Sequence, residues 1–175
     1  GAVVTYIDQT ATIGGTGAAR NYLGSVADPS RPVRITLVWT DPPGAADPSL
    51  VNDLDLEVTV GGHTYKGNVL SGGSSVAGGM RDSVNNVENV FLPAGLSGSL
   101  FVRVKGTAIN GDGIIGNGDA TDQHFALVVH NGSVALAASA FPAKGEPLVL
   151  TGNAILEPNE CNMVSIPLTN NGEST

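Results

Sequence analysis

Cysteine is almost absent from this sequence. Cys161 is the only one among 175 residues, so no disulfide can form within the chain and a disulfide-stapled scaffold is excluded. Aromatic residues make up only 5%, so a hydrophobic core must be built mainly from Val, Leu, Ile and Ala. No run of 18 apolar residues occurs, so no segment predicts a transmembrane helix.

Charged residues are also few, at 14%, and basic residues are the scarcer kind. There are 8 Lys and Arg against 16 Asp and Glu, which gives a net charge of −8. Nucleic acids and anionic membrane surfaces are attracted by positive charge. We therefore expect neither nucleic acid nor membrane as a partner.

The sequence does contain short stretches of alternating apolar residues, separated by turns that use its 24 Gly and 10 Pro. In residues 33–40 one face carries Val33, Ile35, Leu37 and Trp39, so we expect Trp39 to be buried. No window of eleven residues has a helical period. The pattern predicts an all-β fold: an antiparallel β-sandwich, barrel or jelly roll of about eight or nine short strands.

Further strands and two long loops are expected along the chain. The expected strands are residues 2–7, 21–26, 54–60, 63–66, 86–92, 100–105 and 124–130. A Gly- and Ser-rich exposed loop is expected at 70–80, and an acidic loop at 110–122.

Acidic residues are concentrated between residues 41 and 88, where Lys66 and Arg81 are the only basic residues. Asp53, Asp55 and Glu57 fall on one face of a predicted strand, where they repel each other unless something positive lies there. Calcium takes six to eight oxygen ligands at about 2.3–2.6 Å. The candidate calcium ligands are Asp41, Asp53, Asp55, Asp82, Asn86 and Glu88.

Two other interpretations of these acids are open. They can form a solvated acidic rim with turn-forming Asp and Asn, or an internal network with Lys66 or Arg81. A second, weaker metal candidate is the loop at 110–122, which does not fit an EF-hand and can equally be a flexible surface hairpin. Its candidate ligands are Asp112, Asn117, Asp119 and Asp122.

Several ordered blocks resemble one known family. VRITLVWTDPP, LVNDLDL, Gly-Asn, DSVNNVE and FALVV occur at residues 33–43, 50–56, 67–68, 82–88 and 125–129. Together they resemble the C-terminal, P-domain-like β-barrel of secreted subtilisin-like serine proteases (subtilases), across roughly residues 1–132. The resemblance implies a jelly roll in a secreted, non-catalytic accessory domain that packs on and stabilises the catalytic domain of the same chain, often with structural calcium.

No residue of this sequence matches the catalytic residues of that family. Ser74 and Ser75 lie in a Gly-rich segment that lacks the Gly-Thr-Ser-Met-Ala pattern, and none of the three histidines has the His-Gly-Thr setting of subtilases. The histidines are His63, His124 and His130, and they offer no zinc-binding spacing. We expect this chain to have no enzymatic activity, and the parent protein to be a serine endopeptidase.

Composition changes after residue 131. The expected domains are a jelly-roll barrel at 1–132, a linker at 133–147 whose first part (133–140) is either linker or peripheral strand, and a module at 148–175. The pattern GNxxLEPNECNxxxIPLTNNG in that module resembles the first strands of immunoglobulin-like repeats. We expect a few extended strands there.

A binding role is the main alternative. A jelly roll in a secreted hydrolase can target glycan or protein substrates, usually through exposed aromatic side chains. With Trp39 in the core, the remaining platform would be Tyr6, Tyr22 and Tyr65. A third interpretation is that the parent enzyme is a hydrolase of another class.

Overall fold

Ten β-strands and no helix are found in residues 2–44 and 49–137, the part of the chain that the computed structural model describes. This part therefore contains no helix that could cross a membrane. The predicted module at 148–175 and Cys161 lie outside it. The strands are β1 (Val4–Ile13), β2 (Ala19–Val26), β3 (Val33–Val38), β4 (Asn52–Val60), β5 (His63–Ser71), β6 (Ser74–Ala77), β7 (Val87–Leu92), β8 (Ser99–Ile109), β9 (Gln123–His130) and β10 (Gly132–Leu136).

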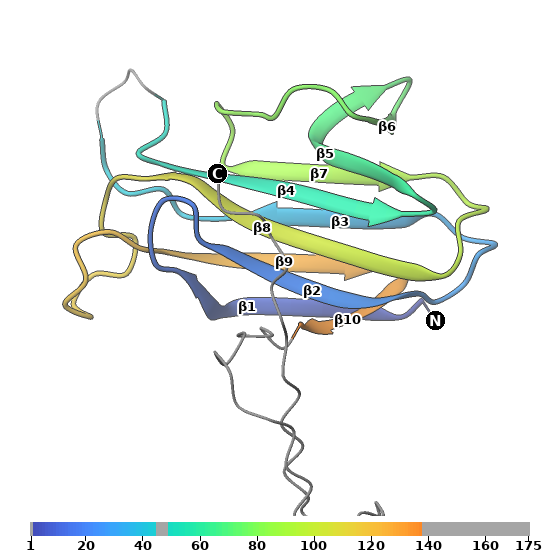
Figure 1. Ribbon diagram of the computed structural model, residues 1–175, viewed down its shortest axis with the longest axis horizontal. Helices are drawn as coiled ribbons and strands as arrows, with labels where there is room; N and C mark the ends of the chain where they lie inside the picture. Colours follow the sequence, from blue (N-terminus) through green and yellow to red (C-terminus); the bar gives the residue numbers. More distant parts are fainter. Residues whose placement is uncertain (1, 45–48, 138–175) are drawn as a thin grey trace, which may run out of the picture. The chain divides into compact units, whose positions relative to one another are not determined.

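The strands form two antiparallel sheets packed face to face (Figure 1). The first sheet has the order β1-β9-β3-β7, and the second has the order β10-β2-β8-β4-β5-β6. Successive strands change sheet at most steps, so residues far apart in sequence become neighbours. The predicted all-β sandwich is confirmed.

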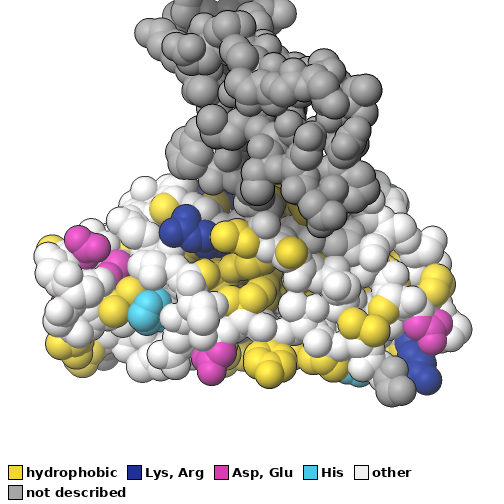
Figure 2. All heavy atoms as spheres, turned by 90° about the horizontal axis from the view of Figure 1, so that it is seen from below, with side chains coloured by type: hydrophobic (Ala, Val, Ile, Leu, Met, Phe, Trp, Pro, Cys, Tyr) yellow, Lys and Arg dark blue, Asp and Glu magenta, His cyan; other side chains and the backbone are white. Residues whose placement is uncertain are grey.

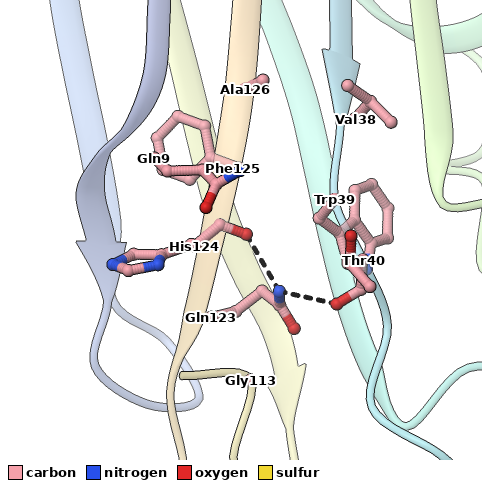
Figure 3. A pocket seen from close by; sticks show the side chains of 9 residues that line it. All are labelled: Gln9, Val38, Trp39, Thr40, Gly113, Gln123, His124, Phe125 and Ala126. Atoms are coloured by element: carbon pink, nitrogen blue, oxygen red, sulfur yellow. Dashed lines mark hydrogen bonds between the residues drawn. The ribbon is translucent and has the colours of Figure 1, made fainter. Parts of the chain in front are cut away.

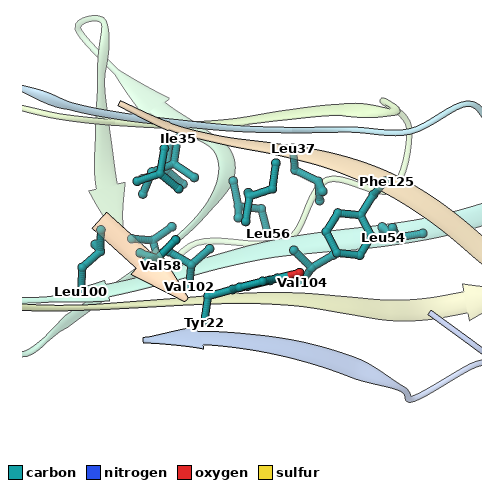
Figure 4. Packing of buried hydrophobic residues seen from close by; sticks show 14 of the residues in the cluster. Tyr22, Ile35, Leu37, Leu54, Leu56, Val58, Leu100, Val102, Val104 and Phe125 are labelled. Atoms are coloured by element: carbon teal, nitrogen blue, oxygen red, sulfur yellow. The ribbon is translucent and has the colours of Figure 1, made fainter. Parts of the chain in front are cut away.

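The core lies between the sheets and follows from the alternation in the sequence. Ile35 and Leu37 of β3 face Leu56 of β4 and Val102 of β8, and all four are fully buried (Figure 4). Trp39 is 3% exposed, which confirms its predicted burial. The core is mostly aliphatic, as the low aromatic content predicts.

Side chains join the two sheets at both edges of the sandwich. On one edge, Thr5 Oγ1 of β1 donates a hydrogen bond to Gly132 O of β10 (3.1 Å). On the other, Phe91 N of β7 donates to Ser75 Oγ of β6 (2.9 Å). These contacts use polar backbone groups that the sheet ladders leave free.

The loop predicted at residues 70–80 is wrong for residues 70–71 and 74–77, which lie in strands. β5 continues to Ser71, and β6 returns after a turn at Gly72-Gly73, whose φ angles of +58° and +81° suit a two-residue hairpin turn. The Gly and Ser content indicated an irregular loop because it contains few of the residues typical of strands.

The strand β10 also changes the expected domain boundary. It pairs with β2 from Gly132–Val26 to Leu136–Tyr22. Residues 133–136 are therefore a peripheral strand of the sandwich rather than linker, because their backbone completes the ladder at the edge of the larger sheet. The compact unit that contains the described residues reaches Ala137.

Candidate functional site

The outer face of β4 carries the acidic residues that the sequence singled out. Asp53 and Asp55 alternate with the core residues Leu54 and Leu56, so their side chains leave the sheet on the side away from the core. They are nevertheless only 7% and 6% exposed. An acidic pair covered in this way needs a compensating charge.

Glu88 reaches the same region from the opposite sheet. β4 and β5 are paired only as far as the Glu57–Lys66 pair, so Leu56 N–H finds no partner on that strand. Glu88 of β7 fills the gap: its Oε2 accepts a hydrogen bond from Leu56 N at 2.6 Å. The carboxyl group is held between the sheets, where it is 1% exposed.

Gly67 of β5 makes room for Glu88. A Cβ on Gly67 would lie only 2.7 Å from Glu88 Cβ and would overlap the carboxyl group. The Gly-Asn block of the sequence therefore has a steric role beside Glu88, which the sequence alone did not suggest.

Arg81 supplies the nearest positive charge. Its Nη1 is bonded to Asp53 Oδ2 and lies 3.8 Å from Asp55 Oδ1. Thr107 Oγ1 of β8 donates a hydrogen bond to Asp55 Oδ2. The carboxylates of β4 are thus held by an arginine and a hydroxyl group.

Three carboxyl oxygens remain without a hydrogen-bond partner among the described residues: Asp53 Oδ1, Asp55 Oδ1 and Glu88 Oε1, all of them buried. They belong to a site with a pocket of about 210 Å³ beside it. The pocket is lined by Asp55, Leu56, Glu57, Lys66, Gly67, Arg81, Glu88 and Lys105.

Burial and mutual repulsion raise the pKa values of Glu88 and Asp55. Desolvation raises the pKa of Glu88 to about 8, and the charges of Asp55, Asp82 and Asp53 act in the same direction. Desolvation also raises the pKa of Asp55, with the charge of Asp53 adding to it. The folded protein therefore favours fewer negative charges here than three ionised carboxyl groups would give.

The other three predicted calcium ligands have side chains that hydrogen-bond to neighbouring groups. Asp41 accepts hydrogen bonds from Asn52 N (2.7 Å) and Val51 N (2.9 Å). Asn86 Nδ2 donates to Trp39 O (2.9 Å). Both side chains serve nearby backbone groups, as Asp and Asn do at turns.

Asp82 is also occupied. Its Oδ1 accepts from Val84 N and Asn85 N, and its Oδ2 accepts from the side chains of Asn68 and Asn85. Desolvation opposes ionisation, but these hydrogen bonds outweigh it and lower the pKa of Asp82. Within residues 2–44 and 49–137, no three Asp, Glu, His or Cys side chains are arranged as a metal site.

The side chains of the second metal candidate accept hydrogen bonds from within their own loop. Asp112 Oδ1 accepts from Ile114 N, and Asn117 Oδ1 accepts from Asp119 N. Both oxygens of Asp122 accept hydrogen bonds from the loop, from Gly113 N and Asn117 Nδ2. These contacts favour the alternative of a surface hairpin.

The sequence did not predict a buried polar network that lies beside the loop at 110–122. Asn52 is fully buried, and its Nδ2 donates to Gly111 O, Asp122 O and Gln123 Oε1 at 2.8–3.1 Å. Gln123 Nε2 in turn donates to Thr40 O and His124 O, beside a hollow of about 170 Å³ (Figure 3). The sequence feature that could have indicated this network is Asn52, which directly precedes the alternating residues 53–60. Because its amide is satisfied on both sides, the network positions loops rather than offering a free site.

The candidate serine Ser75 has a structural role in the fold. Ser75 is 7% exposed, and its Oγ accepts a hydrogen bond from Phe91 N.

Tyr22 is 2% exposed and belongs to the core (Figure 4), so the expected aromatic platform is wrong for this residue. Tyr6 is 75% exposed. On the side of the molecule where β1 and β10 lie, hydrophobic side chains are visible among few charged ones (Figure 2).

Comparison of the sequence with protein-family models and with curated proteins gave no match. The resemblance to subtilase C-terminal barrels therefore depends on the sequence blocks alone.

Proposed function

We propose that this chain is a non-catalytic accessory domain of a secreted subtilisin-like serine protease, which packs on and stabilises the catalytic domain of the same chain. One observation carries the proposal: the sequence blocks of the resemblance contact each other directly. Trp39 Nε1 of the first block donates to Asn52 O of the second (2.9 Å). Glu88 of the fourth block accepts from Leu56 of the second and lies against Gly67 of the third.

Direct contacts of this kind explain why such blocks would occur together. A change in one block disturbs a partner in another, so the set behaves as one framework. Its polar members are used to hold strands and loops rather than to face a substrate. That favours a structural role over catalysis, and the alternation of strands between the sheets supports the jelly-roll interpretation.

The outer face of the four-stranded sheet offers a surface for packing. Tyr6 lies opposite Val128 across β1 and β9, and Val38 lies opposite Val87 across β3 and β7. These four side chains are 75%, 39%, 37% and 38% exposed, in the same order. Apolar side chains grouped on an exposed sheet face are typical of surfaces that meet another domain.

Calcium forms part of the proposal, in a smaller site than the sequence predicted. We propose that Asp53, Asp55 and Glu88 hold it, because one buried oxygen of each has no hydrogen-bond partner among the described residues and their residue types suit a hard cation. The ion would supply the positive charge that these carboxylates need, and its role would be structural.

The test is to assay the chain and the full-length protein that contains it. We expect the purified chain not to hydrolyse casein, and the full-length protein to hydrolyse it with sensitivity to a serine-directed inhibitor such as phenylmethylsulfonyl fluoride. Casein hydrolysis by the chain that Ser75→Ala abolishes would contradict the non-catalytic role. A full-length protein without inhibitor-sensitive peptidase activity would contradict the parent class.

A further inference from the structure

A hollow of about 170 Å³ opens on the outer face of the four-stranded sheet, the face proposed above to meet another domain (Figure 3). Val38 and Ala126 pair across β3 and β9 and alternate with core residues, so they line the hollow from its outer side. We infer that this hollow receives one tyrosine side chain from the catalytic domain that packs on the face. The inference deepens the proposed packing surface and rests on it.

The hollow exists because both neighbours of β9 leave it at the same point. On one side, β1 shifts its register between Asp8 and Thr12, so it bulges away from β9. On the other side, Trp39 N beyond the end of β3 donates to Asn86 O rather than to β9 (3.2 Å). The hollow is therefore built into the course of three strands.

Gln9 lies in this bulge with a φ of +51°, a backbone conformation that favours glycine. Its side chain lines the hollow. Strained backbone of this kind clusters at ligand clamps and other functional sites. Glycine would adopt the conformation without strain but would supply no side chain, so the carboxamide is what glutamine adds at this position.

The hollow offers uncharged hydrogen-bonding groups that are not in use. The side chains of Gln9, Thr40 and His124 line it and form no hydrogen bond with any described residue. Gln123, by contrast, is bonded to Thr40 O and His124 O (Figure 3). Among the described residues that line the hollow there is no Lys, Arg, Asp or Glu. Amide, hydroxyl and imidazole groups both donate and accept, so they suit a hydroxyl group better than an ion.

The rest of the wall is apolar, and the space is small. Trp39, Phe125, Val38 and Ala126 contribute to it. Sites for drug-sized ligands measure about 300–1,000 Å³, so this hollow has room for one side chain rather than for a larger ligand. Trp39 and Phe125 are 3% and 1% exposed, so they lack the open ring faces that glycan binding usually uses. Tyrosine carries both an apolar ring and a hydroxyl tip, and it therefore matches both parts of the wall.

The experiment is a titration of the isotope-labelled chain with N-acetyltyrosinamide, followed by NMR, with N-acetylphenylalaninamide as the matched ligand without a hydroxyl group. Trp39 is the only tryptophan of the sequence, so its indole N–H gives a single signal beside the hollow. We expect the tyrosine derivative to shift this signal, and the phenylalanine derivative to bind about 2- to 12-fold more weakly for want of one hydrogen bond. No shift with the tyrosine derivative up to its solubility limit, or equal binding of the two ligands, would overturn the inference.

Gln9→Gly and Thr40→Val test the named side chains. Gln9→Gly removes the carboxamide and relieves the positive φ, so the tyrosine derivative should bind about 2- to 12-fold more weakly while resistance to urea stays equal or rises. Thr40→Val removes a hydroxyl at an exposed position and serves if Gln9→Gly does not fold. Thr10→Ala, in the bulge but outside the lining, should bind as the parent does. Parent-like binding by Thr40→Val and by a folded Gln9→Gly would overturn the inference.

Hydrogen exchange in the full-length protein tests the occupant. The amide of Thr40 donates to no described residue, and it should exchange more slowly in the full-length protein than in the chain alone, because the catalytic domain covers it. Equal exchange would overturn the catalytic domain as the occupant. Failure of the titration would leave the accessory role standing. A full-length protein without peptidase activity would remove the proposed function, whereas binding of the tyrosine derivative would still support the hollow as a tyrosine site.

Discussion

At the scale of the residue, Glu88 is a charged residue at a buried strand position, and its carboxyl group serves as a hydrogen-bond acceptor there. It occupies a core-facing position of β7, in alternation with the buried residues Val90 and Leu92. A carboxyl group is tolerated there because Leu56 N–H needs an acceptor and Gly67 leaves space. The cost of burial is expressed in its raised pKa.

Glu88→Gln should change how stability depends on pH. The pKa of Glu88 is about 8 in the folded protein and near its ordinary 4.5 when unfolded, so the folded state holds the proton more tightly. Stability should therefore fall as pH rises from about 4.5 to about 8, by at most about 1.4 kcal/mol per pH unit from this group. Glutamine retains an acceptor for Leu56 N–H and does not titrate, so its slope should be shallower.

The measurement is the free energy of unfolding by urea at several values between pH 5 and pH 8, in EDTA, for parent and variant. Asp55 titrates in the same direction in both proteins, so only the difference in slope reports Glu88. Parallel pH profiles would show that Glu88 is not held neutral by burial.

Gly67→Ala should destabilise the chain. The added Cβ would overlap the Glu88 side chain, which is itself fixed by Leu56 N, and overpacking of this kind costs about 1–3 kcal/mol. Gly14→Ala is the matched control, because a Cβ there meets nothing within 4 Å and its φ is not positive. Urea unfolding of both variants tests the claim. Equal stabilities would mean that Glu88 is not confined by Gly67.

At the scale of the element, alternation predicted most strands correctly, and it failed where the backbone departs from regular pairing. β3, β4 and β9 lie close to their predicted positions. β1 runs on to Ile13 because an irregularity between Asp8 and Thr12, with Gln9 at a φ of +51°, shifts the phase of the pattern.

The candidate site was predicted in part for a similar reason. Asp53 and Asp55 follow from strand periodicity, and Glu88 from the sequence block that contains it. Asp41 and Asp82 have the residue type of calcium ligands, but nearby backbone N–H groups take up their oxygens. Which donor an oxygen meets depends on turn geometry, and residue type alone does not specify it.

Ser75→Ala should loosen the edge where β6 meets β7. It removes the acceptor of Phe91 N–H, and an unsatisfied buried donor costs about 1–3 kcal/mol. Ser74→Ala, a more exposed change on the same strand, should have a smaller effect. Amide hydrogen exchange at Phe91 should be faster in Ser75→Ala than in Ser74→Ala. Unchanged protection of that amide would show that the hydroxyl contact does not secure the edge.

At the scale of the whole molecule, the described residues form one framework from two sheets joined at both edges by side-chain hydrogen bonds. Polar residues that could have formed sites are mostly occupied in holding this framework, and the covered acids on β4 are the exception. A net charge of −8 and an exposed apolar sheet face fit a domain that meets another protein surface rather than nucleic acid. The proposed stabilising role therefore depends on the whole domain rather than on a single site.

The most direct test of that role is the thermal inactivation of the full-length protein's peptidase activity, measured with and without this chain in calcium and in EDTA. We expect deletion of the chain to shorten the half-life at elevated temperature several-fold in calcium, because a partner that binds only the folded catalytic domain opposes its unfolding. EDTA should shorten the half-life of the intact protein more than that of the deletion variant. Equal half-lives of the two proteins in calcium would contradict a stabilising accessory domain.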